Sequence, residues 1–434
     1  MRLGQFSLTQ ALSTKLCGRS DSELKVLVVT QYYYPENFRV NDLVATLVST
    51  GHDVEVYTGL PNYPGGRIFG EWKLGFSGSN PRIYRVPIIP RRSAEKIQLA
   101  ANYLSFLLMG LFGLLFFRSR DFDAVLSLNY SPNTVSLLGY IIGRLKGANH
   151  YVWVQDLWPE SLIATGVIKD GRLARMVNKV MQWIYQRSAH IFVQSQEFIP
   201  ALAALGVDAS KVSYMPNWAE DIFDQAGQAC MEGSCGAIVN SYKEQGYFVF
   251  CFAGNLGIGQ GLDVFVDVAM RLRPKNIKIV LVGDGRAKAT LEQKTHTQNL
   301  EETLIFLGPR PLSEMPSLFT AADAMLVSLL PDPALNRTIP GKVQSYMRAG
   351  TLIVGAVEGE PARVLREAKQ FVAAPGDVEQ LHEIMLQVAG LTNMEIVARK
   401  RDAKRYYNEN FEREVVVDKF VNTIWTRTQK IEAD

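Results

Sequence analysis

The sequence has 434 residues, of which 47% are hydrophobic and 21% are charged. This composition is typical of a well-packed globular protein, and the length is too great for one ordinary core, which predicts two domains. The formal net charge is only +3, which argues against a nucleic-acid partner unless the charge is unevenly placed. One short stretch does concentrate cations, namely Arg82, Arg85, Arg91, Arg92, Lys96, Arg118 and Arg120.

The N-terminus and the cysteines indicate a cytoplasmic protein. Residues 1–23 contain no long apolar segment, so we expect an N-terminal extension before the first strand and no cleaved signal peptide. Cys230 and Cys235 are close enough in sequence to pair, but free thiols in a reducing cytosol fit the spacing better. The full set of cysteines is Cys17, Cys230, Cys235 and Cys251.

Residues 24–222 alternate between apolar segments of strand length and segments of helical length. We predict strands at residues 24–30, 52–57, 83–86, 124–128, 150–154 and 190–194. We predict helices at residues 40–49, 132–145 and 172–188. This alternation is typical of a parallel sheet that is covered by helices on both faces.

Residues 103–117, YLSFLLMGLFGLLFF, form a run of 15 nearly uninterrupted apolar residues. A membrane-spanning helix needs about 20. The run is therefore either a buried core helix or an interfacial helix that lies in one leaflet. In the second interpretation the flanking arginines lie at the level of the lipid phosphates, where each contributes about 1 kcal/mol. We expect an anionic membrane surface as a partner and a peripheral position on the inner face of the cytoplasmic membrane.

Residues 223–246 contain the small-residue run QAGQACMEGSCGA and are predicted to form a linker. The alternation restarts in residues 247–411, with strands predicted at 247–253, 277–282, 304–307, 324–327 and 352–355. Residues 412–434 are predicted to contain a C-terminal helix. The fold class is therefore α/β, with two Rossmann-like halves.

The segment AGNLGIGQGLD, residues 253–263, lies between a predicted strand and a predicted helix. Its glycines, at positions 254, 257, 259 and 261, would let the backbone approach an anion at the N-terminus of the helix. The pattern is neither GxGxxG nor a Walker motif, and a flexible turn is the alternative interpretation. A second turn, Gly283-Asp284-Gly285, also joins a strand to a helix and could line the same site.

The segment NRTIPGKVQSYMRAG, residues 336–350, is predicted to form a loop followed by a helix. Pro340 and Gly341 predict the start of that helix, and Gly350 predicts its end. Arg337 and Lys342 flank its first turn, where exposed amides and two cations could hold a diphosphate. The alternative is that both are solvated surface charges.

Polar residues also follow two strands of the first half. Asp156, in VWVQDLWPES, could act as a base toward an acceptor hydroxyl, or it could be a turn residue before Pro159. The tyrosine-rich loop YYYPENFRVND could form an acceptor wall that includes Tyr34, Glu36 and Arg39. The histidines are scattered, and no HxxxH or DxD motif follows a strand, so we expect no metal.

In this order, the motifs resemble the GT-B glycosyltransferases of family 4, and the resemblance extends from about residue 24 to residue 430. It is carried by KVLVVTQYYYPENFRVNDL, VQDLWPES, AHIFVQSQEF, GVDASKVSYMPNW, FAGNLGIGQGLD, LVGDGR and TIPGKVQSYMRAG. Within the family, the sequence is most similar to the O-antigen and colanic-acid branch, which includes proteins assigned as L-fucosamine transferases.

The resemblance implies a retaining, metal-independent glycosyltransferase with no cofactor beyond its nucleotide-sugar co-substrate. The C-terminal half would bind the nucleotide sugar, the N-terminal half would bind the acceptor, and a C-terminal helix would cross back to the first half. The branch favours a UDP-linked donor, with UDP-N-acetyl-L-fucosamine as a candidate. It also favours a polyprenyl-diphosphate saccharide as the acceptor, in the synthesis of a bacterial surface polysaccharide such as O-antigen lipopolysaccharide.

The sequence departs from the family pattern at the donor site. Most members have an arginine and a lysine where this chain has Asn255 and Gln260, and their paired glutamates fall at Arg337 and Ser345. The usual diphosphate cations and the ribose-binding carboxylate are therefore missing from their usual places. The donor site implied by the resemblance consists of Gly254, Asn255, Gly257, Gln260, Gly283, Gly285, Arg310, Arg337, Thr338, Ile339, Pro340, Gly341, Lys342 and Ser345.

Two other functions share this fold. A sugar-nucleotide 2-epimerase would not need the apolar helix or its basic flanks, and a phosphorylase would need a lysine-bound cofactor, for which the sequence offers no candidate. A non-catalytic scaffold in a polysaccharide assembly complex is the third hypothesis, because the family glutamates are lost.

Overall fold

The computed structural model describes residues 23–433, apart from residues 64, 71–72, 92–95, 120, 132, 165–167 and 225–232. The N-terminal extension, Cys17, Cys230, Arg92 and Arg120 therefore lie outside the described residues. The chain divides into two compact units, one formed by residues 1–152 and 423–434 and the other by residues 153–422.

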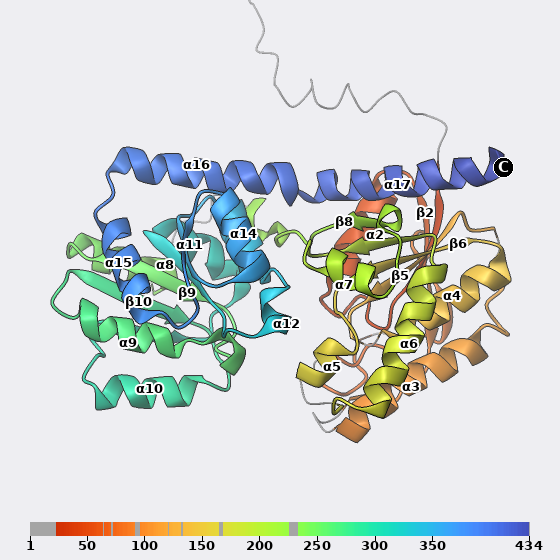
Figure 1. Ribbon diagram of the computed structural model, residues 1–434, viewed down its shortest axis with the longest axis horizontal. Helices are drawn as coiled ribbons and strands as arrows, with labels where there is room; N and C mark the ends of the chain where they lie inside the picture. Colours follow the sequence, from red (N-terminus) through yellow and green to blue (C-terminus); the bar gives the residue numbers. More distant parts are fainter. Residues whose placement is uncertain are drawn as a thin grey trace, which may run out of the picture. The chain divides into compact units, whose positions relative to one another are not determined.

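Two α/β halves, each built on a largely parallel sheet, are present, as the sequence predicted (Figure 1). The first sheet has the strand order β3-β4-β2-β1-β5-β6-β7-β8. Its pairs β1–β2, β1–β5, β2–β4 and β7–β8 are parallel, and β3–β4 is antiparallel. Its strands are β1 (Lys25–Val29), β2 (Asp53–Gly59), β3 (Gly75–Ser77), β4 (Arg82–Val86), β5 (Ala124–Asn129), β6 (Asn149–Val154), β7 (His190–Val193) and β8 (Val212–Tyr214).

Helices cover this sheet, and its central strands are buried along almost their whole length, which explains their continuous apolar runs. The helices are α2 (Arg39–Ser49), α3 (Lys96–Gly113), α4 (Thr134–Lys146), α5 (Glu160–Ala164), α6 (Arg172–Arg187) and α7 (Phe198–Ala204).

Helix α3 contains most of the apolar run, but it begins seven residues earlier than residue 103 and ends at Gly113. Gly110 packs against Leu138 of α4, and Gly113 packs against Tyr57 of β2. A Cβ at either glycine would overlap with that side chain. The opposite side is exposed, with Leu108 at 51%. Helix α3 is thus a core helix on one face and an exposed apolar helix on the other, and its position in a membrane leaflet stays a prediction. Within the described part of the chain, no helix is both long and apolar enough to cross a membrane.

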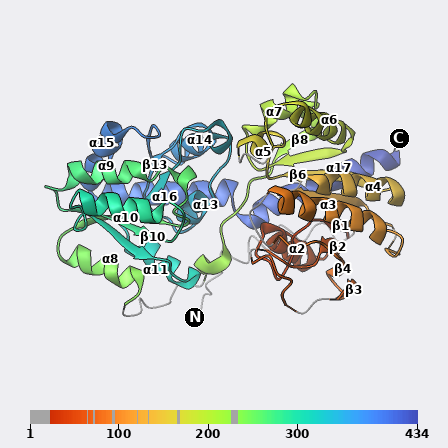
Figure 2. The ribbon, with the colours of Figure 1, turned by 90° about the horizontal axis from the view of Figure 1, so that it is seen from below.

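The second sheet has the strand order β11-β10-β9-β12-β13-β14, and every pair in it is parallel. Its strands are β9 (Phe248–Ala253), β10 (Ile277–Val282), β11 (Leu304–Gly308), β12 (Ala324–Ser328), β13 (Ile353–Ala356) and β14 (Phe371–Ala373). The two faces carry separate hydrophobic cores, one under α9 and α15 and the other under α8, α11, α13 and α16 (Figure 2). The helices are α8 (Cys235–Glu244), α9 (Asp263–Leu272), α10 (Lys288–Thr297), α11 (Met315–Ala321), α12 (Pro333–Asn336), α13 (Gly341–Arg348), α14 (Gly359–Glu367), α15 (Val378–Ala389), α16 (Asn393–Asn410) and α17 (Arg413–Ala433).

The predicted linker, residues 223–246, is wrong in its second half, where residues 235–244 form α8. The Ser234 hydroxyl caps this helix at the amide of Ala237, and the Cys235 amide donates to a Glu314 carboxylate oxygen at 2.8 Å. A Cβ at position 236 would lie 2.8 Å from the Ser317 carbonyl oxygen of α11. Of the small residues that suggested flexibility, Gly236 is therefore required for the close packing of α8 on α11.

The C-terminal helix was predicted within residues 412–434, and α17 occupies Arg413–Ala433. The division of the chain assigns residues 423–434 to the first unit, whereas the start of α17 belongs to the second. The chain therefore returns to the first unit through this helix, as the resemblance implied.

Candidate functional site

The carboxyl ends of β9 and β10 carry the two glycine turns, and these pack backbone against backbone. The Gly254 amide donates to the Val282 carbonyl at 2.9 Å, and the Leu256 amide donates to the Asp284 carbonyl at 2.8 Å. Gly254 and Gly283 have φ values of +136° and +140°, which L side chains rarely adopt. A Cβ at Gly283 would also overlap with the Gly254 carbonyl oxygen. These glycines therefore fix one shape for the loop, and their role toward an anion stays a prediction.

The rest of the glycine loop is equally constrained. Gly285 faces the Leu256 carbonyl, where a Cβ would lie only 2.5 Å away. Gly261 ends the short 3₁₀ turn Ile258–Gln260 with a φ of +60°. Gly257 lies against the Asn255 side chain, and a Cβ at Gly257 would be 2.9 Å from the amide nitrogen of that side chain. The alternative of a flexible turn does not fit this packing.

Lys342 reaches this loop from the first turn of α13. Its Nζ donates to Gln260 Oε1 at 2.6 Å and lies 3.6 Å from the centre of the Phe252 ring. A Cβ at Gly254 would be 3.6 Å from the same nitrogen. Burial lowers the pKa of Lys342 to about 7. A cation that bonds a neutral amide beside a glycine loop is arranged to receive an anion.

Ser345 lies on the same face of α13, one turn after Lys342. Its hydroxyl donates to a Glu220 carboxylate oxygen at 2.8 Å. The neighbouring Ala219 is held in place by Tyr407, whose hydroxyl accepts from the Ala219 amide at 3.2 Å. Glu220 was not predicted from the sequence, although an acidic residue directly after PNWA was visible. The structure thus brings a carboxylate next to Ser345, the position at which the resemblance places one of the family glutamates.

The segment before α13 is shaped by its own contacts. Asn336 ends α12 and donates to Glu358, and the Thr338 hydroxyl donates to the Leu335 carbonyl at 3.1 Å. Ile339 is buried, and Pro340 is the N-cap residue of α13, which confirms the predicted start of the helix. Arg337 directly follows α12 and is half-buried, and Gly341 is exposed.

Arg310, another predicted donor residue, is used elsewhere. Its Nη1 donates to the Gly233 carbonyl at 3.4 Å and lies 4.0 Å from Glu314, and its Nε donates to the Leu307 carbonyl at 3.3 Å. These contacts join the end of β11 to the start of α8, so Arg310 has a structural task. The residues that the structure does gather around the glycine loop and α13 are Gly254, Gln260, Lys342 and Ser345, together with Glu220.

The predicted acceptor wall in the first half differs from the structure. Glu36 is 1% exposed, and its carboxylate accepts the amides of Asn62, Tyr63 and Tyr33 at 2.8, 2.7 and 3.2 Å. Burial raises the pKa of Glu36, and these bonds oppose the rise. The Glu36 carboxylate therefore holds the loop after β1 against the loop that contains Asn62 and Tyr63. Buried polar groups need such hydrogen bonds in place of those to water. Tyr34 is 65% exposed.

The other charged residue of that loop is Arg39, at the first position of α2. Its guanidinium lies 3.4 Å from Asp42 in an i,i+3 ion pair. Like Glu36, it is held by the protein itself, and the structure leaves Tyr34 as the exposed member of the predicted wall.

Asp156 lies two residues beyond the end of β6 and is half-buried. Beside it is a cluster of three amide side chains that was not predicted from the sequence. Asn217 donates to Gln155 Oε1 at 2.8 Å and to Gln194 Oε1 at 3.3 Å, and Gln194 donates to the Gln155 carbonyl at 3.0 Å. Within the described residues, Gln155 Nε2 and Asn217 Oδ1 are buried without a hydrogen-bond partner. Amides carry no charge that would single them out in a sequence.

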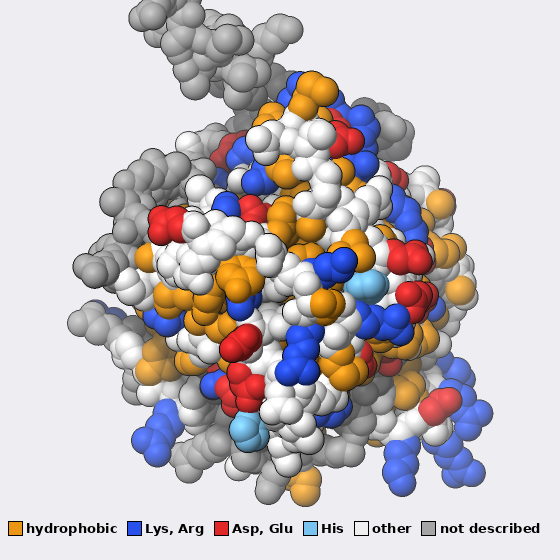
Figure 3. Space-filling view, turned by 90° about the vertical axis from the view of Figure 1, so that its left-hand side faces the viewer, with side chains coloured by type: hydrophobic (Ala, Val, Ile, Leu, Met, Phe, Trp, Pro, Cys, Tyr) orange, Lys and Arg blue, Asp and Glu red, His pale blue; other side chains and the backbone are white. Residues whose placement is uncertain are grey.

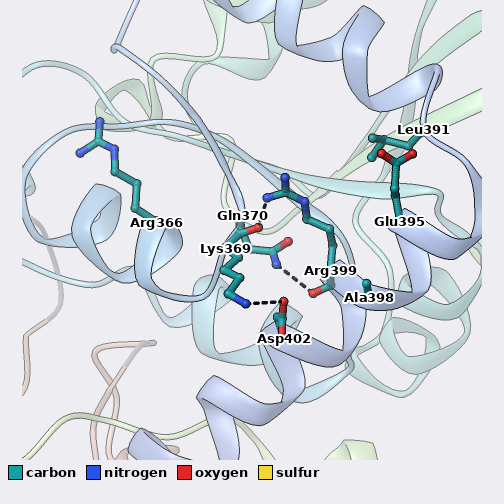
Figure 4. A pocket seen from close by; sticks show the side chains of 8 residues that line it. All are labelled: Arg366, Lys369, Gln370, Leu391, Glu395, Ala398, Arg399 and Asp402. Atoms are coloured by element: carbon teal, nitrogen blue, oxygen red, sulfur yellow. Dashed lines mark hydrogen bonds and ion pairs between the residues drawn. The ribbon is translucent and has the colours of Figure 1, made fainter.

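A cavity of about 470 Å³ lies elsewhere, between the end of α14 and α16 (Figure 4). In its lining, Lys369 Nζ is 3.4 Å from Asp402, and Arg399 donates to the Lys369 carbonyl. It contains none of the predicted donor residues. In the part of the chain that the structure describes, no three His, Cys, Asp or Glu side chains are grouped so that they could hold a metal ion.

Comparison with known families finds a match in each half. Residues 37–218 match the glycosyl transferase 4-like domain, and residues 247–390 match the glycosyl transferases of group 1. The two matches together cover more than half of the chain.

Two curated relatives are also named as glycosyltransferases. The Escherichia coli K12 protein WcaI, named as a colanic acid biosynthesis glycosyl transferase, is 22% identical over 92% of this chain and 100% of its own length. The Pseudomonas aeruginosa protein WbjE, named as a glycosyltransferase, is 24% identical over 58% of this chain and 62% of its own.

Solved structures share the fold. Anabaena HepE in complex with UDP and glucose has a TM-score of 0.61 at 14% identity, covering 93% of this chain and 100% of its own. Trehalose 6-phosphate synthase from Burkholderia multivorans has a TM-score of 0.71 at 13% identity, covering 95% and 98%. At this identity the likeness shows the two-domain fold alone.

Proposed function

Because the chain is a glycosyltransferase that uses nucleotide-sugar donors and carries one glycosyltransferase domain in each half, we propose that it transfers the sugar to a lipid-linked saccharide in the synthesis of a bacterial surface polysaccharide. The reaction retains the anomeric configuration, needs no metal and takes a UDP-linked donor. The observation that carries the donor site is the Lys342 ammonium, which lies between Gln260, Phe252 and Gly254 at the first turn of α13.

The donor diphosphate binds at the N-terminus of α13. The amides of that first turn point toward an anion, and Lys342 adds a full positive charge. An approaching diphosphate raises the pKa of Lys342 from about 7, because a nearby negative charge favours the protonated form. Arg337, at the end of α12 and four residues before the start of α13, supplies a second cation. These groups take the place of the family cations that Asn255 and Gln260 replace.

The ribose of the donor lies next to Glu220. A carboxylate beside a Rossmann-type phosphate site commonly accepts hydrogen bonds from ribose hydroxyls. Glu220 is oriented by the Ser345 hydroxyl one turn beyond Lys342, which is the order that a nucleoside diphosphate requires.

In the transfer step, the acceptor oxygen bonds to the anomeric carbon and the bond from that carbon to the diphosphate breaks. The acceptor proton passes to the departing diphosphate on the same face. Lys342 and the α13 amides stabilise the charge on the diphosphate. Asp156 orients the acceptor hydroxyl and weakens its O–H bond.

Helix α3 contacts the lipid part of the acceptor. Its exposed side chains Leu104, Leu108 and Phe112 are 53%, 51% and 57% exposed, and an apolar groove of about 460 Å³ lies between α3 and residues 87–89. Exposed apolar side chains next to arginines are typical of helices that lie in a membrane interface. The naming of WcaI for colanic acid biosynthesis supports the same acceptor class.

The test is a thermal-shift panel of UDP-, GDP- and dTDP-sugars, since a ligand that binds only the native state raises its melting temperature. The stabilising donor, carrying a radiolabelled sugar, is then incubated with polyprenyl-diphosphate saccharides. At a donor concentration below the wild-type Kd, we expect label in the lipid fraction for the wild type and at least about tenfold less label for Lys342→Ala. Binding without transfer would favour a scaffold, and an isomerised free nucleotide sugar would favour an epimerase.

A further inference from the structure

Helix α6 (Arg172–Arg187) is amphipathic in an unusual way. One face is buried against the protein through Ala174, Met181, Ile184 and Tyr185. Gln182 and Gln186, near the C-terminal end of α6, donate to the Leu205 carbonyl at the end of α7, at 2.9 and 3.1 Å. The two helices lie side by side (Figure 2), so this end of α6 is held against α7. Its exposed side therefore belongs to a fixed element of the fold.

A second apolar stripe runs along the outer side of α6. Leu173, Met176, Val180 and Trp183 are 50%, 59%, 42% and 39% exposed. Their spacing of three and four residues places them on one side of the helix, next to the buried face. Burying four such side chains is favourable only against an apolar partner.

The charges of α6 all have one sign. Arg172, Arg175, Lys179 and Arg187 are exposed, and the helix contains no aspartate or glutamate. The Arg187 guanidinium covers the Trp183 ring at 4.6 Å from its centre. By contrast, the face of the molecule drawn in Figure 3 mixes basic and acidic side chains. The outer side of α6 thus combines apolar contact area, a tryptophan and a band of positive charge.

We propose that the outer side of α6 binds an anionic lipid bilayer. The apolar stripe enters the boundary between headgroups and acyl chains, and the four cations bind lipid phosphates, as in other interfacial helices with basic polar faces. Trp183 takes the position that tryptophans favour at membrane interfaces. This surface lies in the unit formed by residues 153–422, whereas α3 lies in the other unit, and the inference does not depend on glycosyl transfer.

A second copy of the chain is a poorer occupant of this surface. In a symmetric pair the same patch meets itself, and the four cations of one helix would face the four of the other at an energetic cost. A stable protein interface also buries roughly 800 Å² on each partner, and four side chains supply only part of that area. A bilayer has the opposite charge and no limit on area.

The test uses the full chain and vesicles of phosphatidylglycerol and phosphatidylcholine in equal parts, with pure phosphatidylcholine vesicles as the uncharged reference. Arg175→Gln with Lys179→Gln should lower the partition coefficient about fivefold for each charge removed. Met176→Ser with Val180→Ser should lower it about tenfold or more. Arg273→Gln with Lys275→Gln, which removes two exposed cations after α9, is the matched control and should change it little.

The fluorescence of Trp183 reports its position directly. With brominated acyl chains in the vesicles, the wild type should lose part of its tryptophan emission, and Trp183→Phe should bind as before but lose most of that quenching. Circular dichroism melting of each variant separates a binding defect from unfolding.

Three results would overturn the proposal. The first is a wild type that binds neither kind of vesicle. The second is that Leu104→Ser with Leu108→Ser in α3 abolishes binding while the α6 variants bind like the wild type; the α3 contact would then stand alone. The third is that the α6 variants change the oligomeric state of the protein in solution and leave vesicle binding intact.

Discussion

The loops that follow β1 and β9 each connect a central strand to a helix, and they use their charged groups differently. In the loop after β1, Glu36 is buried and bonded to three backbone amides of its own unit. In the loop after β9 there is no charged residue before Asp263, and the cation comes from Lys342 on another element. The first loop uses its charge to hold its own shape, whereas the second leaves a charge next to a neutral amide.

This difference shows where a ligand can add binding energy. A carboxylate whose oxygens are already bonded to buried amides gains little from a new partner, because its desolvation is already compensated. An enclosed ammonium with one neutral partner gains a great deal from a diphosphate. The charged residues of a loop sequence therefore indicate a binding site only when the fold leaves them unsatisfied.

The largest expected effect concerns the first half, where the proposed acceptor-side residue Asp156 follows β6 and not β1. We expect Asp156→Asn to lower kcat about 10²-fold or more, which is the range for general acid–base groups. Donor affinity should hardly change, because the proposed donor site is built from the loops after β9 and β10 and from α13. Steady-state kinetics and calorimetric donor binding on the same preparations test this. Full activity would reduce Asp156 to a turn residue, and loss of donor binding would point to misfolding.

The second effect concerns the donor cations. Lys342→Ala and Arg337→Ala should each weaken donor binding by about 1.5–3 kcal/mol, the usual size of a charge-assisted contact. Arg310→Ala is the matched control, because its guanidinium is bonded to Gly233 and Leu307, and donor affinity should stay the same. Calorimetry measures all three. If Arg310→Ala weakens binding as much as Lys342→Ala does, the assignment of these cations is wrong.

The third effect tests whether Glu36 is structural. Glu36→Gln places an amide nitrogen near the amides of Tyr33 or Tyr63, both of which are donors. We expect the free energy of unfolding to fall by about 1–3 kcal/mol, as for other unsatisfied buried groups. Tyr34→Ala, at a 65% exposed position, should change it by less than about 0.5 kcal/mol. Urea denaturation gives both values. A stable Glu36→Gln variant with lost activity would restore Glu36 to the acceptor site.

The fourth effect is a pH dependence of donor binding. The pKa of Lys342 in the empty site is about 7, so below this value the lysine is already charged and above it binding must take up a proton. Donor affinity should therefore be highest below pH 7 and should fall by up to about tenfold per pH unit above it. A UDP-sugar is the probe, because its diphosphate does not titrate in this range.

Lys342→Arg is the control for this pH dependence, since an arginine stays charged throughout. The donor affinity of this variant should not depend on pH, from about one pH unit below to about two units above the pKa of Lys342 in the wild type. A wild type with a flat profile would mean that Lys342 is charged in the empty site.

Much of the fold could be predicted from the sequence because its signals are local. The strand predicted at residues 247–253 is Phe248–Ala253, and the helix start at Pro340 is where α13 begins. Apolar runs of strand length and a proline before a glycine are recognised within a few residues. Helix α8 was missed because its small residues serve packing against α11, and that partner is distant in sequence.

The site was harder to predict, because its contacts join distant segments. Ser345 and Glu220 are 125 residues apart, Lys342 and Gln260 are 82 apart, and Glu36 bonds Asn62 across 26 residues. Sequence motifs identified Lys342 and Gln260 separately. Nothing local in the sequence indicates that Glu220 faces α13 or that Glu36 faces inward.

The smallest expected effect concerns Glu220 and the preference of the donor site for ribose over 2′-deoxyribose in the nucleotide. If its carboxylate accepts a ribose hydroxyl, the wild type should bind UDP about fivefold to tenfold more tightly than 2′-deoxy-UDP, the size of one partly exposed hydrogen bond. Glu220→Gln should bring that ratio close to one, because the amide is a weaker acceptor, while the diphosphate contacts at Lys342 are kept. Ser345→Ala should lower the ratio less, since it removes only the hydroxyl that orients Glu220. Glu379→Gln, an exposed carboxylate paired with Arg271, is the matched control. An unchanged ratio in Glu220→Gln would remove this residue from the ribose site, whereas a wild type that binds neither nucleotide would instead remove the donor assignment itself.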